Sequence, residues 1–288
     1  MAALATGSAV AAPSRGGPLA ALAAHWPEYL IEGWALGTFM LSAALVTTLL
    51  EWPASPVHAA IPDPDARRVL IGLGMGLTAI LLIYSPWGQR SGAHMNPAVT
   101  ITFWRLGKVR GWDALFYVLA QFAGGTAGVA VAAWWLGPAF TADPVRYVVT
   151  VPGPAGVAWA FGAEVLIAAG MMAVILRVSG TPRLAALTGV FAGLLVATYI
   201  SIEAPLSGMS INPARSFASA LPAGEWRAFW IYLLAPLAGM ALGAGIHQSF
   251  GRGSVACAKL LHPADQRCIH CGYRPPPAAD VPHNGGTR

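Results

Sequence analysis

Long uncharged, apolar stretches alternate along this chain with short segments that carry its charges. Apart from one glutamate, Glu164, six stretches contain no Asp, Glu, Lys or Arg: 33–50, 69–89, 114–142, 147–176, 184–202 and 228–251. A helix needs about 20 mostly apolar residues to cross the roughly 30 Å hydrocarbon core of a bilayer. We therefore expect six membrane-spanning helices, near 29–50, 69–86, 114–136, 157–178, 184–202 and 228–249. The apolar runs are continuous rather than alternating, which favours helices over a β-barrel.

The composition agrees with a membrane environment. Apolar residues make up 56% of the chain, charged residues only 10%, and the mean hydropathy is +0.58. A soluble globular protein would carry roughly a quarter charged residues. The sequence therefore predicts an integral membrane protein in a lipid bilayer, and it has no aromatic and basic pattern that would indicate nucleic-acid binding.

The chain also contains an internal repeat. The tripeptide Asn-Pro-Ala occurs as Asn96-Pro97-Ala98 and again as Asn212-Pro213-Ala214, and each copy follows the second expected span of its half. Glycine pairs follow both copies at matching distances, Gly124/Gly128 and Gly239/Gly243. A glutamate, Glu32 or Glu164, lies near the start of each half. The two repeats run over about 29–136 and 157–249.

Three spans in each repeat, an odd number, make the second repeat face the opposite side of the membrane. Between each tripeptide and the next span there is room only for a re-entrant loop and a half-helix. Asparagine is a good N-cap, and proline is favoured in the first turn of a helix. Irregular backbone at membrane depth is tolerated where it lines a wet cavity, and half-helix N-termini that meet near the midplane form a site there. The sequence thus predicts two half-helices that meet in a pore.

The segments 91–100 and 208–216, which contain the two tripeptides, resemble the signature of the aquaporins, the major intrinsic protein family, in its bacterial type. The resemblance covers about 29–250. It implies an all-α membrane protein, a right-handed bundle of six transmembrane helices plus two re-entrant half-helices. It also implies a homotetramer with one pore in each subunit.

The two asparagines are the main candidate pore residues. Their carboxamide N–H groups can donate to the oxygen of a passing water or hydroxyl, while the helix N-termini behind them carry partial positive charge. A water held in this way cannot accept a proton from the next water, which opposes proton hopping. The plainer alternative is that both asparagines only cap helices, but the inverted pair favours a place in the pore wall.

The resemblance also implies a narrow selectivity filter. Arg215, which directly follows the second tripeptide, is expected there, because a charge deep in a membrane is costly and usually functional. Met209 is the second position. Met75 is the third by alignment, although counting back from Asn96 gives Gly76, and the fourth is either Thr198 or Ile200. This set matches neither the water-selective nor the glycerol-conducting pattern of the family.

His94, Glu32 and Glu164 are expected to support the two loops. His94 lies two residues before Asn96, and we expect it to hydrogen-bond to backbone rather than to act as a gate. Intramembrane carboxylates are often proton relays. The pairing of Glu32 and Glu164 with the repeat instead favours acceptors for loop N–H groups.

Basic residues predict the orientation. They are more numerous in the segments around 87–112, around 177–183 and after 251 than on the opposite side. By the positive-inside rule both termini are then cytoplasmic, and a bacterial inner membrane is expected. Residues 1–28 are interpreted as a flexible tail, 29–250 as the channel domain and 251–288 as a cytoplasmic tail.

All three cysteines lie in that last tail. Cys268 and Cys271 have the spacing of zinc ligands, and Cys257 with His262 would complete a Cys3His site. The other reading is a tail with three free thiols. No cofactor is expected for transport itself, only this structural zinc.

Together these features predict a passive channel for water and small neutral solutes such as glycerol, which excludes ions and protons and is no enzyme. An ion-coupled secondary transporter of a small solute, with a metal-responsive tail, is the alternative, since inverted repeats with broken helices also build transporters.

Overall fold

The computed structural model describes residues 16–250 and 255–275, and every regular element within these ranges is a helix. Six are long and apolar enough to cross a membrane. They are α1 (Pro18–Glu51), α3 (Pro64–Tyr84), α6 (Gly111–Leu136), α8 (Val157–Ser179), α9 (Thr188–Ile202) with the 3-10 turn η2 (Ala185–Leu187) before it, and α12 (Trp230–Ser249). The six predicted spans are confirmed, and all but the first begin within about five residues of the prediction.

The first helix is longer than the sequence predicts. We expect a flexible tail over 1–28, but α1 begins at Pro18, so 18–28 is helical; residues 1–15 lie outside the described part. Proline is well suited to the first helical turn and the alanines that follow are strong helix formers. This first part of α1 is also anchored, because His25 Nδ1 lies 2.8 Å from Asp113 Oδ1 of α6 and Glu28 accepts from Arg90 at 3.0 Å.

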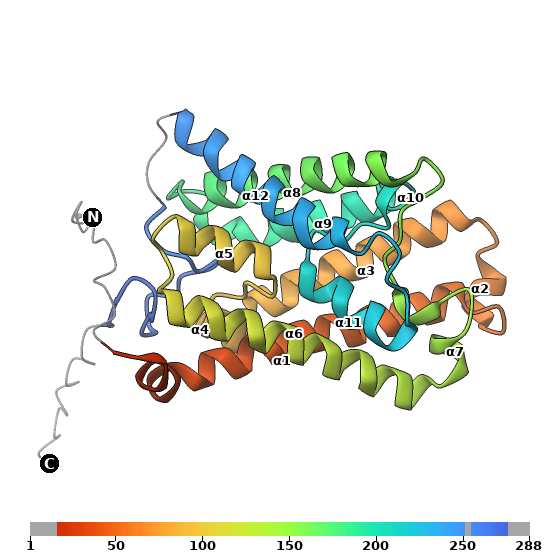
Figure 1. Cartoon of the computed structure of the whole chain (residues 1–288), viewed down its shortest axis with the longest axis horizontal. Coiled ribbons are helices and arrows are strands. Elements are labelled where there is room, and N and C mark those ends of the chain that lie inside the picture. The colour runs from red at the N-terminus through yellow and green to blue at the C-terminus, as the bar shows by residue number, and fades with distance from the viewer. Residues whose placement is uncertain (1–15, 251–254, 276–288) are drawn as a thin grey trace, which may run out of the picture.

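Shorter helices connect the spans. The two longest, α5 (Pro97–Arg105) and α11 (Pro213–Ala223), are the half-helices that the sequence predicts. The remaining ones lie in connecting segments: α2 (Pro56–Ala60), α4 (Pro86–Ser91), α7 (Pro138–Thr141), η1 (Arg146–Val148) and α10 (Ala204–Ser207). In Figure 1 the long helices run side by side, and α5 and α11 lie among them, α5 toward the end where α4 lies and α11 toward the end where α7 lies.

Small residues let the spans cross closely at equivalent places in the two repeats. A side chain at Gly124 of α6 would overlap the backbone carbonyl of Gly33 in α1, and one at Gly128 would overlap that of Gly37. In the second repeat, Gly239 of α12 packs in the same way against backbone of α8. Close approach of this kind is a common means of helix association in membranes. It pairs the first and third spans of each repeat, α1 with α6 and α8 with α12.

The outer surface suits lipid. Large apolar side chains are exposed along the spans, including Leu73, Leu77 and Leu81 of α3. Exposed tryptophans lie near helix ends, as Trp104 and Trp112 do at one end of the bundle and Trp134 and Trp159 do at the other. Tryptophan is enriched at membrane interfaces. The molecule is thus an integral membrane protein.

Residues 255–275 contain no regular helix or strand, yet they are packed against the bundle. They lie at the end where α1 begins and α12 ends, beside α4 (Figure 1). Ala258, Leu260 and Cys268 are buried there. The part of the predicted C-terminal tail that the structure describes is therefore folded onto the channel domain.

Candidate functional site

The two half-helices begin at the Asn-Pro-Ala tripeptides. Asn96 caps α5, with its Oδ1 accepting from the backbone N–H of Ala98 at 2.9 Å. Asn212 caps α11, with its Oδ1 accepting from Ala214 at 3.1 Å and from Arg215 at 3.2 Å. The prolines occupy the first helical turn, where a missing N–H leaves no bond unmade. Each asparagine therefore has its oxygen turned toward its helix and its NH2 group free to point away.

Each NH2 group is held by the other repeat. Nδ2 of Asn96 donates to the carbonyl oxygen of Ile211 at 2.7 Å, and Nδ2 of Asn212 donates to the carbonyl oxygen of Met95 at 2.7 Å. A carboxamide nitrogen carries two donors. One N–H of each asparagine is thus fixed by the opposite loop, and the second remains for a molecule in the cavity that both residues line. The two half-helix N-termini meet at this point.

The loops that lead into the half-helices are strained in the same way in both repeats. Ala93 and Met95 have φ values of 54° and 50°, and Met209 and Ile211 both have 49°. A left-handed backbone costs roughly 1–2 kcal/mol for a residue with a side chain. Such conformations persist only where surrounding contacts hold them.

Glu32 of α1 holds the first of these loops. Its Oε1 accepts from the backbone N–H of His94 at 3.0 Å and from the hydroxyl of Ser91 at 2.8 Å, and its Oε2 accepts from the N–H of Met95 at 2.7 Å. Gln121 of α6 donates to the same carboxylate at 2.8 Å. Every strong acceptor site of this fully buried side chain is used, so the structure places it as a loop support.

Glu164 of α8 does the same in the second repeat. It accepts from the backbone N–H groups of Ser210 and Ile211, each at 2.7 Å, and from the hydroxyl of Ser207 at 2.8 Å. Residues 94 and 95 in the first loop correspond to 210 and 211 in the second. The two carboxylates therefore have the same function in each repeat.

A cavity of about 350 Å³ runs past both asparagines. Of the expected filter residues, Met75, Ile200, Met209 and Arg215 line it. Thr198 does not line it, so this alternative for the fourth filter position is wrong. Thr198 is exposed, and its hydroxyl donates to the carbonyl oxygen of Leu194 in its own helix. Two residues apart on a helix point about 200° apart, so only Ile200 can face the pore.

Met75, rather than Gly76, is the cavity residue of α3, because Gly76 packs against the backbone of Gly193 in α9. Arg215 also has a partner that the sequence does not indicate. Its guanidinium donates to the hydroxyl of Thr150, in the segment between η1 and α8. Thr150 lies outside both signature segments, so no motif marks it.

His94 connects the pore to the C-terminal segment. Its Nε2 donates to the carbonyl oxygen of Ala258 at 2.9 Å, which leaves Nδ1 to accept from the hydroxyl of Thr100 at 3.0 Å. The partner is backbone, as expected, but of residue 258 rather than of the loop. His270 stacks on His94, with ring centroids 5.7 Å apart, and its Nε2 donates to the carbonyl oxygen of Ser91 at 3.1 Å. Burial lowers the pKa of His270 to about 3, so its ring is neutral.

One carboxylate outside the spans has no hydrogen-bond partner in the described structure. Glu203, which caps the C-terminus of α9, is 6% exposed and both of its oxygens are buried without a donor. Burial raises the pKa of Glu203 to about 7. It lies at the end of the bundle opposite residues 255–275, beside α10.

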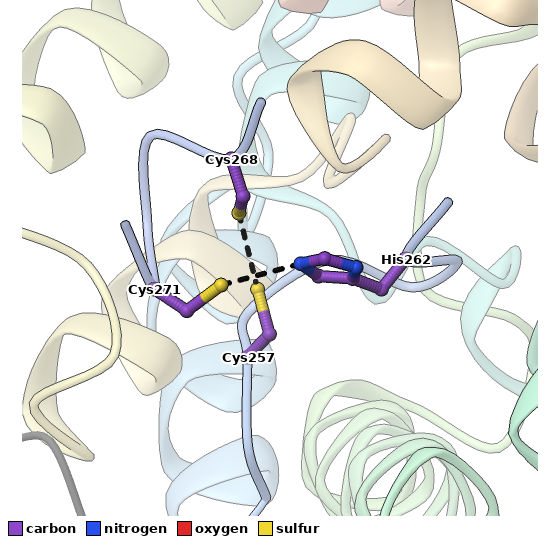
Figure 2. Close-up of side chains that lie close together, drawn as sticks. All are labelled: Cys257, His262, Cys268 and Cys271. Atoms are coloured by element: carbon purple, nitrogen blue, oxygen red, sulfur yellow. Dashed lines mark hydrogen bonds between the residues drawn. The ribbon is translucent and has the colours of Figure 1, made fainter. Parts of the chain in front are cut away.

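The four predicted zinc ligands lie together. Figure 2 shows the side chains of Cys257, His262, Cys268 and Cys271 pointing toward a common centre. Their ligand atoms all lie within 4.8 Å of one another, with Cys257 Sγ 3.4 Å from Cys268 Sγ and His262 Nε2 3.2 Å from Cys271 Sγ. His270, between the two cysteines of the motif, turns away toward Ser91.

The family model and the similar sequences indicate the same family of membrane proteins, and a similar solved structure shows the same fold. Residues 23–247 match the family model described as "Major intrinsic protein". Similar proteins include aquaporin NIP6-1 of Arabidopsis thaliana, 34% identical over 72% of this chain, and probable aquaporin NIP7-1 of the same plant, 29% identical over 83% of this chain and 82% of that protein. The chain spans 59% of the length of putative aquaporin NIP4-1 and 67% of that of NIP6-1.

Among solved structures, the aquaglyceroporin from Plasmodium falciparum has the same fold. Its TM-score to this chain is 0.66 at 18% identity, over 77% of this chain and 95% of that one. The likeness therefore covers nearly all of that channel and leaves about a quarter of the present chain outside it.

Proposed function

Because this chain belongs to the major intrinsic protein family, we propose that it is a passive transmembrane channel for water and small neutral solutes. One observation carries the proposal. Asn96 and Asn212 cap two opposed half-helices, line one cavity and each keep one N–H for a molecule inside it. Family members are channels rather than enzymes, and the proposal includes neither a catalytic step nor a cofactor for transport.

The midplane favours neutral molecules. Each half-helix N-terminus carries roughly half a positive charge, and the two meet on one side of the cavity. The cost of bringing a cation there is raised further by Arg215, which also lines the cavity. A water that accepts from both asparagines has its lone pairs occupied, so it cannot accept a proton from its neighbour in the file. Ions and protons are excluded while water passes.

The filter suits a small polyol as well as water. Met75, Ile200 and Met209 give it three apolar side chains, and Arg215 supplies the donors. The carbon edge of a molecule such as glycerol would lie against the apolar side chains, and its hydroxyls would face the arginine. Methionine adapts its shape readily, which supports passage of solutes larger than water.

The proposal extends to assembly and location. We propose a homotetramer in a plasma membrane, the inner one in a bacterium, with both termini in the cytoplasm. The apolar, lipid-suited faces of the spans support the membrane location. The orientation rests on the basic residues at the end of the bundle where 255–275 lie: Arg90, Arg105, Lys108, Arg110, Arg177 and Arg183.

Transport in reconstituted vesicles tests the function. Proteoliposomes with the purified protein should shrink in sorbitol faster than empty vesicles, with a low activation energy, and should re-swell in glycerol without any ion gradient. A pH-sensitive dye inside should report no proton flux. Uptake that saturates at low solute concentration and needs an ion gradient would establish a secondary transporter instead.

A further inference from the structure

The cluster Cys257, His262, Cys268 and Cys271 has the chemistry and spacing of a tetrahedral metal site. Zinc binds thiolate sulfur at about 2.3 Å and imidazole nitrogen at 2.0–2.1 Å, which puts neighbouring ligand atoms roughly 3.5–3.8 Å apart. The Cys257–Cys268 and His262–Cys271 separations are 3.4 Å and 3.2 Å, and no pair of ligand atoms is more than 4.8 Å apart. Three sulfurs and one nitrogen in this arrangement fit zinc better than the oxygen-preferring ions.

A disulfide explains the cluster less well. A disulfide needs its sulfurs about 2.05 Å apart, whereas Cys257 and Cys268 stand at 3.4 Å and all three cysteines are free. A disulfide would also not explain why the side chains of Cys271 and His262 point toward the same centre as the other two cysteines (Figure 2). Cys257 and Cys268 are buried, while Cys271 is exposed and gives an ion access from solvent.

The backbone around the second pair forms a compact turn. The N–H of Gly272 donates to the carbonyl oxygen of Cys268 at 3.1 Å, and the N–H of Cys268 donates to that of Tyr273 at 2.9 Å. Gly272 has a φ of 76°, which a residue with a side chain rarely adopts. A segment this short cannot build a core of its own, and small units of this kind are commonly held by a metal.

The ligands enclose the residues that dock on the pore. Between Cys257 and His262, the carbonyl of Ala258 accepts from His94 and the N–H of Leu260 donates to the carbonyl oxygen of Gly92 at 3.2 Å. An ion bound to Cys257 and His262 would fix both ends of this four-residue link, 258–261. The conformation of 258–260 is thereby tied to occupancy of the site.

Leu260 reaches the pore itself. It is 4% exposed and lines the same cavity as His94, Val99 and Asn96. We call this end of the cavity, bounded by Ala93, His94, Val99 and Leu260, the tail-side mouth. An apolar side chain that narrows a water path raises the cost of hydration there.

We propose that Cys257, His262, Cys268 and Cys271 bind one zinc ion, and that the bound metal holds residues 255–275 across the tail-side mouth so that Leu260 restricts flow. Loss of zinc frees the segment and opens this mouth. The metal site stands on its own geometry, while its effect on flow rests on the proposed channel function.

Metal analysis and transport together test this. Protein purified without a nickel column or chelator should contain close to one zinc per chain, and cobalt added to the stripped protein should give the visible bands of tetrahedral thiolate coordination. C268S/C271S should bind neither metal and should carry water severalfold faster in proteoliposomes, as should the wild-type protein after zinc is stripped. Asp265→Ala, an exposed change in the same loop, should leave metal and flow unchanged.

Two substitutions of Leu260, which is not a metal ligand, distinguish the effect of metal binding from the effect of narrowing the tail-side mouth. Leu260→Ala should keep its zinc and conduct water faster, and Leu260→Trp should keep its zinc and conduct more slowly. Wild-type protein with no metal and three freely reactive thiols, or with a Cys257–Cys268 disulfide, overturns the zinc site. Bound zinc whose removal leaves water flow unchanged overturns the restriction at the mouth. Absence of water flow in every variant contradicts the channel function instead, and the metal content is read independently of it.

Discussion

Arg215 is positioned by two neighbours of different origin. Its backbone N–H donates to Asn212, the cap of its own half-helix, and its guanidinium donates to Thr150, which is brought in from the segment before α8. The charge is therefore fixed in the wall of the cavity that Met209 and Ile200 also line. A freely moving arginine could not give a filter of constant width.

Replacing Arg215 by valine should loosen selectivity and leave the fold intact. Two like charges 4 Å apart repel by about 4 kcal/mol at an effective dielectric constant of 20, so cation leakage should rise by at least about tenfold. Stopped-flow swelling in glycerol and urea, together with dye-reported ion flux, measures both effects. Arg215→Lys is the matched control: it keeps the charge but loses the planar donor geometry, so ions should stay excluded. A valine variant with an unchanged solute and ion profile would place Arg215 outside the filter.

At the scale of helices, the pairing of spans depends on backbones in contact. Gly33 and Gly37 of α1 face Gly124 and Gly128 of α6, with no side chain between them. A methyl group at this crossing would overlap backbone atoms of the facing helix. The backbone cannot move away as a flexible side chain could. Glu32 lies on the same stretch of α1. The crossing therefore also determines where along the bundle its carboxylate meets the loop before α5.

Gly124→Ala should therefore lower stability, by about 1–3 kcal/mol as for other overpacked cores. Gly162→Ala provides the comparison, because Gly162 lies within α8 and has nothing within 4 Å of the position where a Cβ would be. Alanine favours helix over glycine by up to about 1 kcal/mol, so this second variant should be neutral or more stable. Thermal unfolding in detergent distinguishes the two. Equal shifts would show that the α1–α6 crossing is looser than described.

The spans and half-helices could be predicted from the pattern of apolar and motif residues along the chain. The features that could not be predicted depend on contacts between distant segments. Continuous apolar runs determine spans, and the repeated tripeptide with its cap and proline determines the half-helices, so both were accessible from the chain alone. The start of α1 was not, because 18–28 are held by Asp113 and Arg90, which are distant in sequence. Thr198 and Ile200, two residues apart on α9, remained alternatives because no motif there defines which side of the helix faces the pore, and only Ile200 lines the cavity.

At the scale of the whole molecule, charge is unequally distributed. Basic residues gather at the end of the bundle where 255–275 lie. At the opposite end, Arg67 and Arg146 are paired with Glu51 and Glu225. Orientation in membranes follows the number of Lys and Arg in short loops. The end with α4 and the C-terminal segment should thus face the cytoplasm.

Reporter fusions in a bacterial host would determine this orientation. Green fluorescent protein joined after residue 288 should fluoresce, and alkaline phosphatase at the same place should be inactive. Alkaline phosphatase joined after residue 137, at the end of α6, should be active because that end should be outside. The reverse pattern would show that the charge distribution does not set the orientation.

The placement of the C-terminal segment could not have been predicted. The spacing of the cysteines and His262 predicts the four zinc ligands. Nothing in the sequence indicates that Ala258 and Leu260 hydrogen-bond to His94 and Gly92, some 165 residues earlier. Such contacts depend on the shape of the finished bundle. The same holds for Thr150 beside Arg215.

The exchanged hydrogen bonds at the midplane define a symmetry of the chain. Asn96 is held by the carbonyl of Ile211 and Asn212 by the carbonyl of Met95, so neither repeat positions its own donor. Because Met95 and Ile211 each directly precede the asparagine of their own repeat, the contact is self-complementary, as at a two-fold interface between identical subunits. One polypeptide here carries both partners of what is geometrically a dimer, and the axis that relates them lies in the membrane plane and crosses the pore between the two asparagines.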